Sequence, residues 1–76
     1  MPHVEIKCFS GRTDEQKTLC AEKIAEVTVD TLGCKTSTVS VAIKDVPEEQ
    51  WKEKVWDAHI VPDEPYLYKK TGYICE

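Results

Sequence analysis

The sequence MPHVEIKC (residues 1–8) alternates between polar and apolar side chains after its proline. In an extended chain, one side would carry Val4, Ile6 and Cys8, and the other would carry His3, Glu5 and Lys7. This two-residue period predicts a half-buried strand that starts at Pro2. A proline is tolerated at the start of a strand because it has no ladder hydrogen bond to lose there.

Pro2 has a second possible role, because removal of Met1 would turn its amide nitrogen into a secondary amine. A chain-terminal amine titrates at about 7.7–8.0, and burial or nearby cations lower that value. Such an amine could serve as a general base near neutral pH, with its direction fixed by the ring. The Met1-Pro2 pair alone still favours an ordinary strand-leading proline.

A long amphipathic helix is predicted to begin at residue 14 and to end at residue 31 or 32. Thr13 and Gln16 have the spacing of a capping box before it, and Gly33 is the expected C-terminal stop. Its apolar stripe is predicted to consist of Cys20, Ile24, Val27 and Thr31, widened by Ala21, Ala25, Thr28 and Leu32.

A second alternating segment, residues 38–44 (TVSVAIK), predicts another strand. Strand, helix and strand form a β-α-β unit, so the two strands should be parallel. Asp45 is expected to cap a second helix that runs to about Ile60. Its apolar residues fall on two sides, Trp51, Val55 and Ala58 on one and Trp56 and Ile60 on the other. An aromatic tail, residues 66–74, completes the chain and is expected to cover a sheet edge.

The length of 76 residues predicts a single domain, residues 1–76, with a small core. Such a chain buries only about 60% of the surface that its unfolded form exposes. Two parallel strands do not make a stable sheet by themselves, so partner strands are expected from another subunit. The sequence therefore predicts an oligomer, and a homodimer with a four-stranded sheet is favoured over a hexamer.

The composition argues against some classes of partner and indicates a cellular compartment. The net charge is −4 with both signs interspersed, which argues against nucleic acid and against a membrane surface as partners. The four cysteines form no Cys-x-x-Cys pair, and neither histidine has finger-like spacing from them, so no metal is expected. Without a signal peptide or a membrane-spanning run, the sequence predicts a reduced, cytoplasmic protein.

The pairing of Pro2 at the start of a strand with GRTDEQK (residues 11–17) at the start of a helix resembles the 4-oxalocrotonate tautomerase family. The resemblance covers about two-thirds of the chain closely. The Trp-containing second helix and the KKTGY tail (residues 69–73) are similar to its longer, dimeric phenylpyruvate tautomerase-like branch. The resemblance implies an α+β fold with the tautomerase/MIF-like β-α-β unit, in which subunits pair into a four-stranded sheet with helices on one face.

The resemblance also implies the roles of three residues. Pro2 would be the acid/base that moves a proton between the enol oxygen and the carbon of a small 2-oxo acid. Arg12 would bind the substrate carboxylate or carbonyl, which a guanidinium suits by offering parallel donors, although a solvated loop arginine is an equal interpretation. Trp51 would wall the pocket and exclude water, or serve as a core or interface residue. No cofactor is implied, because the substrate's own carbonyl is the electron sink.

One residue departs from the family pattern. The hexameric members carry a second arginine on the second strand, and this chain has Ser40 there. That difference argues against a dicarboxylate and favours an aromatic monocarboxylate such as the enol of phenylpyruvate. Two alternatives remain open at this point: a Pro-dependent dehalogenase or decarboxylase on the same scaffold, and a non-catalytic oligomeric module, which a retained Met1 would favour.

Overall fold

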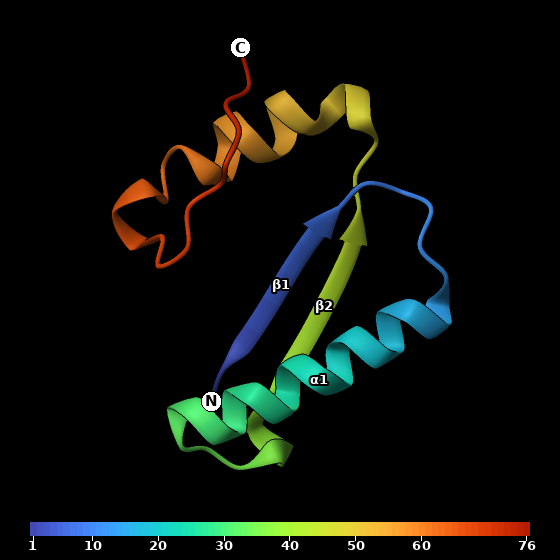
Figure 1. Ribbon diagram of the computed structural model, residues 1–76, viewed down its shortest axis with the longest axis vertical. Helices are drawn as coiled ribbons and strands as arrows, with labels where there is room; N and C mark the ends of the chain where they lie inside the picture. Colours follow the sequence, from blue (N-terminus) through green and yellow to red (C-terminus); the bar gives the residue numbers. More distant parts are fainter. The chain divides into compact units, whose positions relative to one another are not determined.

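The computed structural model describes residues Met1–Glu76. The chain forms, in order, β1 (His3–Cys8), α1 (Asp14–Leu32), η1 (Thr36–Thr38), β2 (Ser40–Asp45), η2 (Glu48–Gln50), η3 (Lys52–Ile60) and η4 (Glu64–Tyr66) (Figure 1). Three of these are short 3₁₀ helices, and η3 is wound as a π-helix. The backbone contacts divide the chain into two compact units, Met1–Asp45 and Val46–Glu76.

The first unit is the predicted β-α-β unit. Strands β1 and β2 are parallel, with a register that runs from His3 opposite Ser40 to Cys8 opposite Asp45. Figure 1 shows α1 returning along the two strands from the carboxyl end of β1 toward its start. The half-buried side chains Val4, Ile6, Val41 and Ile43 come from alternate strand positions, as the sequence pattern predicts.

Both ends of α1 confirm the predicted helix boundaries. The Thr13 hydroxyl accepts from the Gln16 backbone N–H at 3.1 Å, and the Gln16 side chain accepts from the Thr13 N–H at 2.8 Å. This is the complete capping box, and it satisfies two backbone donors at once. At the other end, Gly33 has φ +70°, and its N–H donates to the Val29 carbonyl at 3.1 Å. A left-handed residue there favours glycine, which has no Cβ to strain.

The predicted apolar stripe of α1 is wrong in part. The covered or half-covered positions are Lys17, Ala21, Ile24, Ala25, Thr28 and Val29, while Cys20, Val27, Thr31 and Leu32 are exposed. Two polar residues fit on the covered side because each has a partner. Lys17 pairs with Asp45 at 3.1 Å, and the Thr28 hydroxyl donates to the Ile24 carbonyl at 2.7 Å. The covered face thus includes Lys17 and Val29, which lie outside the predicted stripe.

The second strand starts at Ser40, two residues after its predicted start. Residues Thr36–Thr38 form η1 instead, because the backbone N–H and the hydroxyl of Thr38 both donate to the Lys35 carbonyl, at 3.0 and 2.7 Å. A local turn of this kind competes with the strand ladder for the same donor.

The second unit contains the predicted second helix, and it ends at Ile60 as expected. The predicted Asp45 cap is wrong, because Asp45 is the last residue of β2 and its carboxylate holds Lys17; no side chain caps η2 or η3. The two-sided apolar pattern is also wrong. Trp51, Val55, Trp56 and Ile60 are covered or half-covered, and all the other residues from 52 to 59 are exposed, Ala58 among them.

The π winding of η3 explains this regrouping. The N–H of Val61 donates to the carbonyl of Trp56, five residues earlier, at 2.9 Å. Residues five apart are brought together by such bonding, whereas the prediction assumed the tighter α-helical repeat. No helix of the chain combines the length and the apolar content that crossing a bilayer requires.

Candidate active site

Pro2 lies immediately before β1 and is half-buried, while Met1 is fully exposed. The backbone N–H of Ser40 donates to the Pro2 carbonyl at 3.2 Å, which extends the ladder between β1 and β2 by one residue. The position of Pro2 is therefore held by the adjacent strand, although its own nitrogen contributes no donor. This ordered start of β1 gives the proline nitrogen a fixed place on the sheet.

Ser40 also reaches the residue after Pro2. Its hydroxyl oxygen and the imidazole Nδ1 of His3 lie 2.6 Å apart, across the register pair that starts the ladder. Both side chains are exposed. Ser40 thus presents a neutral hydroxyl at this end of the sheet, and that hydroxyl is engaged with His3.

Farther along the same sheet face, Glu5 has two cations. Lys7 lies 2.8 Å from one of its carboxylate oxygens, and Lys44 on β2 lies 3.3 Å from the other. The hydrogen bond from Lys7, followed by that from Lys44, lowers the pKa of Glu5 below its ordinary value. The polar side chains on this side of the sheet are therefore paired with one another.

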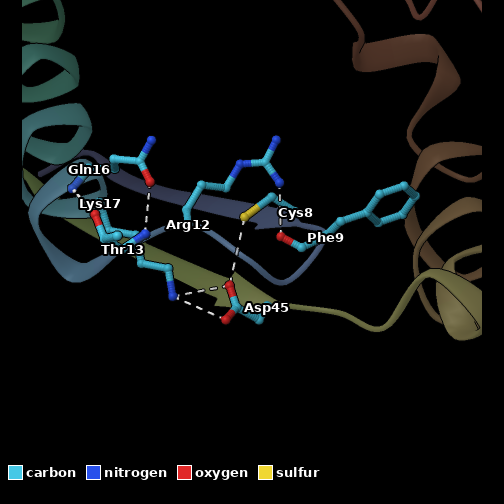
Figure 2. A network of polar contacts seen from close by, with 7 residues as sticks. All are labelled: Cys8, Phe9, Arg12, Thr13, Gln16, Lys17 and Asp45. Atoms are coloured by element: carbon cyan, nitrogen blue, oxygen red, sulfur yellow. Dashed lines mark hydrogen bonds and ion pairs between the residues drawn. The ribbon is translucent and has the colours of Figure 1, made fainter.

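Arg12 lies at the opposite end of β1, in the loop that leads into α1. Its Nη1 donates to the Phe9 carbonyl at 3.0 Å, which ties the guanidinium to its own loop (Figure 2). Arg12 makes no ion pair, so its other N–H groups can bind an anion. The start of α1 directly after it adds positive potential. This end of the first unit is suited to a carboxylate.

The neighbouring lysine is differently placed. Lys17 Nζ lies 3.1 Å from both carboxylate oxygens of Asp45, and the Cys8 thiol lies 3.9 Å from one of them (Figure 2). The charge of Lys17 is thereby offset within the chain, so Arg12 is the better anion-binding group of the two. A cavity of about 290 Å³ beside them is lined by Ile6, Cys8, Arg12, Gln16, Lys17, Cys20 and Ile43.

The structure does not bring Pro2 and Arg12 together within one chain. They lie beyond the two ends of β1, which spans His3–Cys8 (Figure 1). At about 3.3 Å per residue, a strand of this length separates its ends by roughly 20 Å. A small 2-oxo acid is far too short to contact both residues of the same chain.

Trp51 belongs to the second unit, between η2 and η3, and is half-buried. Its indole Nε1 donates to the hydroxyl oxygen of Tyr73 at 3.1 Å. Tyr73 also lies against Trp56, with ring centroids 5.5 Å apart and planes inclined by 39°. The sequence analysis did not predict this bond, which joins residues 22 positions apart.

Comparison with known proteins supports one family throughout. The sequence profile of a family described as "Tautomerase enzyme" matches residues 2–53. Tautomerase PptA of Enterobacter sp. (strain 638) is 51% identical over 74 residues, covering 96% of this chain and 97% of that protein. Tautomerase PptA of Klebsiella pneumoniae (strain 342) is 50% identical with the same coverage of both chains.

A solved structure of the 4-oxalocrotonate tautomerase isozymes from Methylibium petroleiphilum is similar in fold. It superimposes with a TM-score of 0.63 at 38% identity, covering 66% of this chain and 81% of that chain. The structural likeness and the profile match both leave part of the chain uncovered, whereas the curated relatives extend over nearly all of it.

Proposed function

The chain belongs to the 4-oxalocrotonate tautomerase family and is an isomerase of keto and enol groups, and we propose that it acts on a small 2-oxo acid with Pro2 as the acid/base. The observation that carries the proposal is the fixed position of Pro2 at the head of β1, where the N–H of Ser40 holds its carbonyl. The family match begins at this residue.

The proposed reaction needs one proton carrier. After removal of Met1, the neutral amine of Pro2 takes the hydroxyl proton of the enol, and the electrons of the O–H bond form the carbonyl. The carbon–carbon double bond then takes the proton back from the ammonium form of Pro2, which makes the new C–H bond and restores the amine. An amine with an ordinary chain-terminal pKa of about 7.7–8.0 can populate both its neutral and its ammonium form near neutral pH.

Arg12 is proposed to bind the substrate carboxylate beside the Pro2 of another subunit. Because the two residues lie at opposite ends of β1, one copy of the chain supplies the base and a second copy supplies the guanidinium. The Arg12 N–H groups that do not hold the Phe9 carbonyl can bind a carboxylate through two parallel hydrogen bonds. A homodimer with a four-stranded sheet is the assembly we propose, since a two-stranded sheet is marginal by itself.

Trp51 is proposed to wall the substrate pocket. Its half-buried indole presents a large apolar surface that would exclude water and favour the neutral amine. A neutral Ser40 near Pro2 favours a substrate with one carboxylate, and the proposed class is an aromatic 2-oxo acid such as phenylpyruvate.

The proposal extends to the domain and its compartment. Residues 1–76 are proposed to act as one domain, because the curated relatives match the chain over 97% of their own length. A cytoplasmic location is proposed because all four cysteines are unpaired, which suits a reducing compartment.

The test follows the ultraviolet absorbance of phenylpyruvate enol as it converts to the keto form. N-terminal mass measurement identifies two preparations, one that retains Met1 and one treated with methionine aminopeptidase. The processed protein should be active and the unprocessed one inactive, because an acylated proline nitrogen is not a base. Pro2→Ala keeps a free amine without the ring and should lower kcat/KM at least tenfold. Equal activity with and without Met1 would overturn the role of Pro2.

A further inference from the structure

Tyr73, in the tail of the chain, contacts both tryptophans of the second unit. Its hydroxyl oxygen accepts the indole N–H of Trp51, 22 positions earlier in the sequence, at 3.1 Å. Its ring lies 5.5 Å from that of Trp56. One side chain therefore joins both tryptophans, one through a hydrogen bond and the other through ring packing.

The geometry constrains the Trp51 indole in particular. An indole has one hydrogen-bond donor, so a ring turned about its bond to Cβ would lose the Tyr73 contact. Tyr73 is itself restrained, because the Thr71 hydroxyl donates to its carbonyl at 2.8 Å and its ring rests against Trp56. Tyr73 is 45% exposed and thus less exposed than the other two tail tyrosines, of which Tyr66 is 74% exposed and Tyr68 is fully exposed.

We propose that Tyr73 is a positioning residue that fixes the orientation of the Trp51 indole for substrate binding; this inference rests on the proposed role of Trp51 in the pocket. Tyr73 contacts Trp51, which is the proposed wall of the pocket, and it affects substrate binding only through Trp51. It lies beyond residues 2–53, to which the family profile extends, so the tail adds a support that the matched segment lacks.

The main test is a double-mutant cycle on kcat/KM for phenylpyruvate enol. Tyr73→Phe keeps the ring against Trp56 and removes only the hydroxyl, so the loss should be that of one neutral hydrogen bond, about 2- to 10-fold. The loss should appear mainly in KM, because the indole wall is present in the bound ground state as well as in the transition state.

The cycle separates positioning from a general structural effect. In a Trp51→Phe background there is no indole N–H to hold, so adding Tyr73→Phe should change nothing further. Tyr68→Phe, at a fully exposed position, is the matched control and should leave kcat/KM unchanged. An unchanged kcat/KM in Tyr73→Phe, or the same loss in the Trp51→Phe background, would overturn the proposal.

A binding measurement keeps this test independent of the proton transfer. In a Trp56→Phe background, Trp51 is the only tryptophan, and its fluorescence reports titration with benzoylformate, an aromatic 2-oxo acid that cannot enolise. Tyr73→Phe should weaken that binding about 2- to 10-fold and Tyr68→Phe should not. If Pro2→Ala left ketonisation unchanged, the proposed function would fail, while this binding result would still support or overturn the role of Tyr73.

Discussion

The imidazole Nδ1 of His3 and the hydroxyl oxygen of Ser40 lie 2.6 Å apart, at the first register pair of the parallel sheet. The backbone N–H of Ser40 also holds the Pro2 carbonyl. Ser40 is thus hydrogen-bonded to the proposed acid/base Pro2 through its backbone and to His3 through its side chain. We therefore expect a cation at this position to change the choice of substrate.

Ser40→Arg should shift the preference from a monocarboxylate toward a dicarboxylate. A guanidinium here could hold a second carboxylate, and hydrogen bonds to charged groups contribute enough for a gain of about tenfold or more. The quantity to compare is kcat/KM for the dicarboxylate enol of 4-oxalocrotonate relative to that for phenylpyruvate enol. Ser37→Arg, at an exposed position in η1, adds the same charge elsewhere. An equal change of this ratio in both variants would contradict the prediction.

Glu5→Gln should lower the free energy of unfolding at neutral pH and have no such effect in strong acid. Lys7 and Lys44 lower the pKa of Glu5 in the folded protein, so the ionised carboxylate stabilises the fold. That stabilisation is present above the unfolded pKa of about 4.3 and is lost as the pH falls through the lower, folded pKa.

Urea unfolding of both proteins from pH 7 to pH 2, at one protein concentration, measures this difference. Added salt should reduce it, because the group is exposed to solvent. Glu22→Gln on α1, whose carboxylate makes no ion pair, serves as the control and should show a smaller difference at pH 7. A difference for Glu5→Gln that stays constant down to pH 2 would rule out the ion pairs as its source.

Thr13→Ala should reduce the free energy of unfolding by about 0.5–2 kcal/mol. The Thr13 hydroxyl accepts the Gln16 N–H, and alanine leaves that donor without its cap. Thr18→Ala, at an exposed position inside α1, removes a hydroxyl without removing a cap and should not destabilise the protein. Urea unfolding at fixed protein concentration compares the two, and equal losses would refute the capping assignment.

Local rules predict much of the first unit from sequence. The alternation in residues 3–8, the capping box at Thr13 and Gly33 each depend on neighbours within four residues, and each matches the structure. These features are enough to define β1, α1 and their parallel connection to β2.

The features that sequence reasoning missed depend on partners far along the chain. Asp45 was expected to cap a helix, but Lys17, 28 positions earlier, holds its carboxylate. The same ion pair places the half-covered Lys17 on the inward side of α1, which a hydrophobic stripe cannot reveal. The bond from Trp51 to Tyr73 likewise joins a helix start to a tail with no periodic pattern.

The separation of Pro2 and Arg12 leads to a test of subunit sharing. Pro2→Ala and Arg12→Ala should each have low kcat/KM alone, because each removes one half of every proposed site. If the variants are unfolded together in equal amounts and refolded, half of the dimers should contain one chain of each kind. In such a dimer one site has both Pro2 and Arg12 and the other has neither, so activity should return to about a quarter of wild type.

Pro2→Ala mixed with the Pro2→Ala, Arg12→Ala double variant cannot form an intact site and should stay inactive. If the first mixture also stays inactive while mass spectrometry of the intact dimers shows mixed dimers, each chain must use its own Arg12, which the length of β1 opposes.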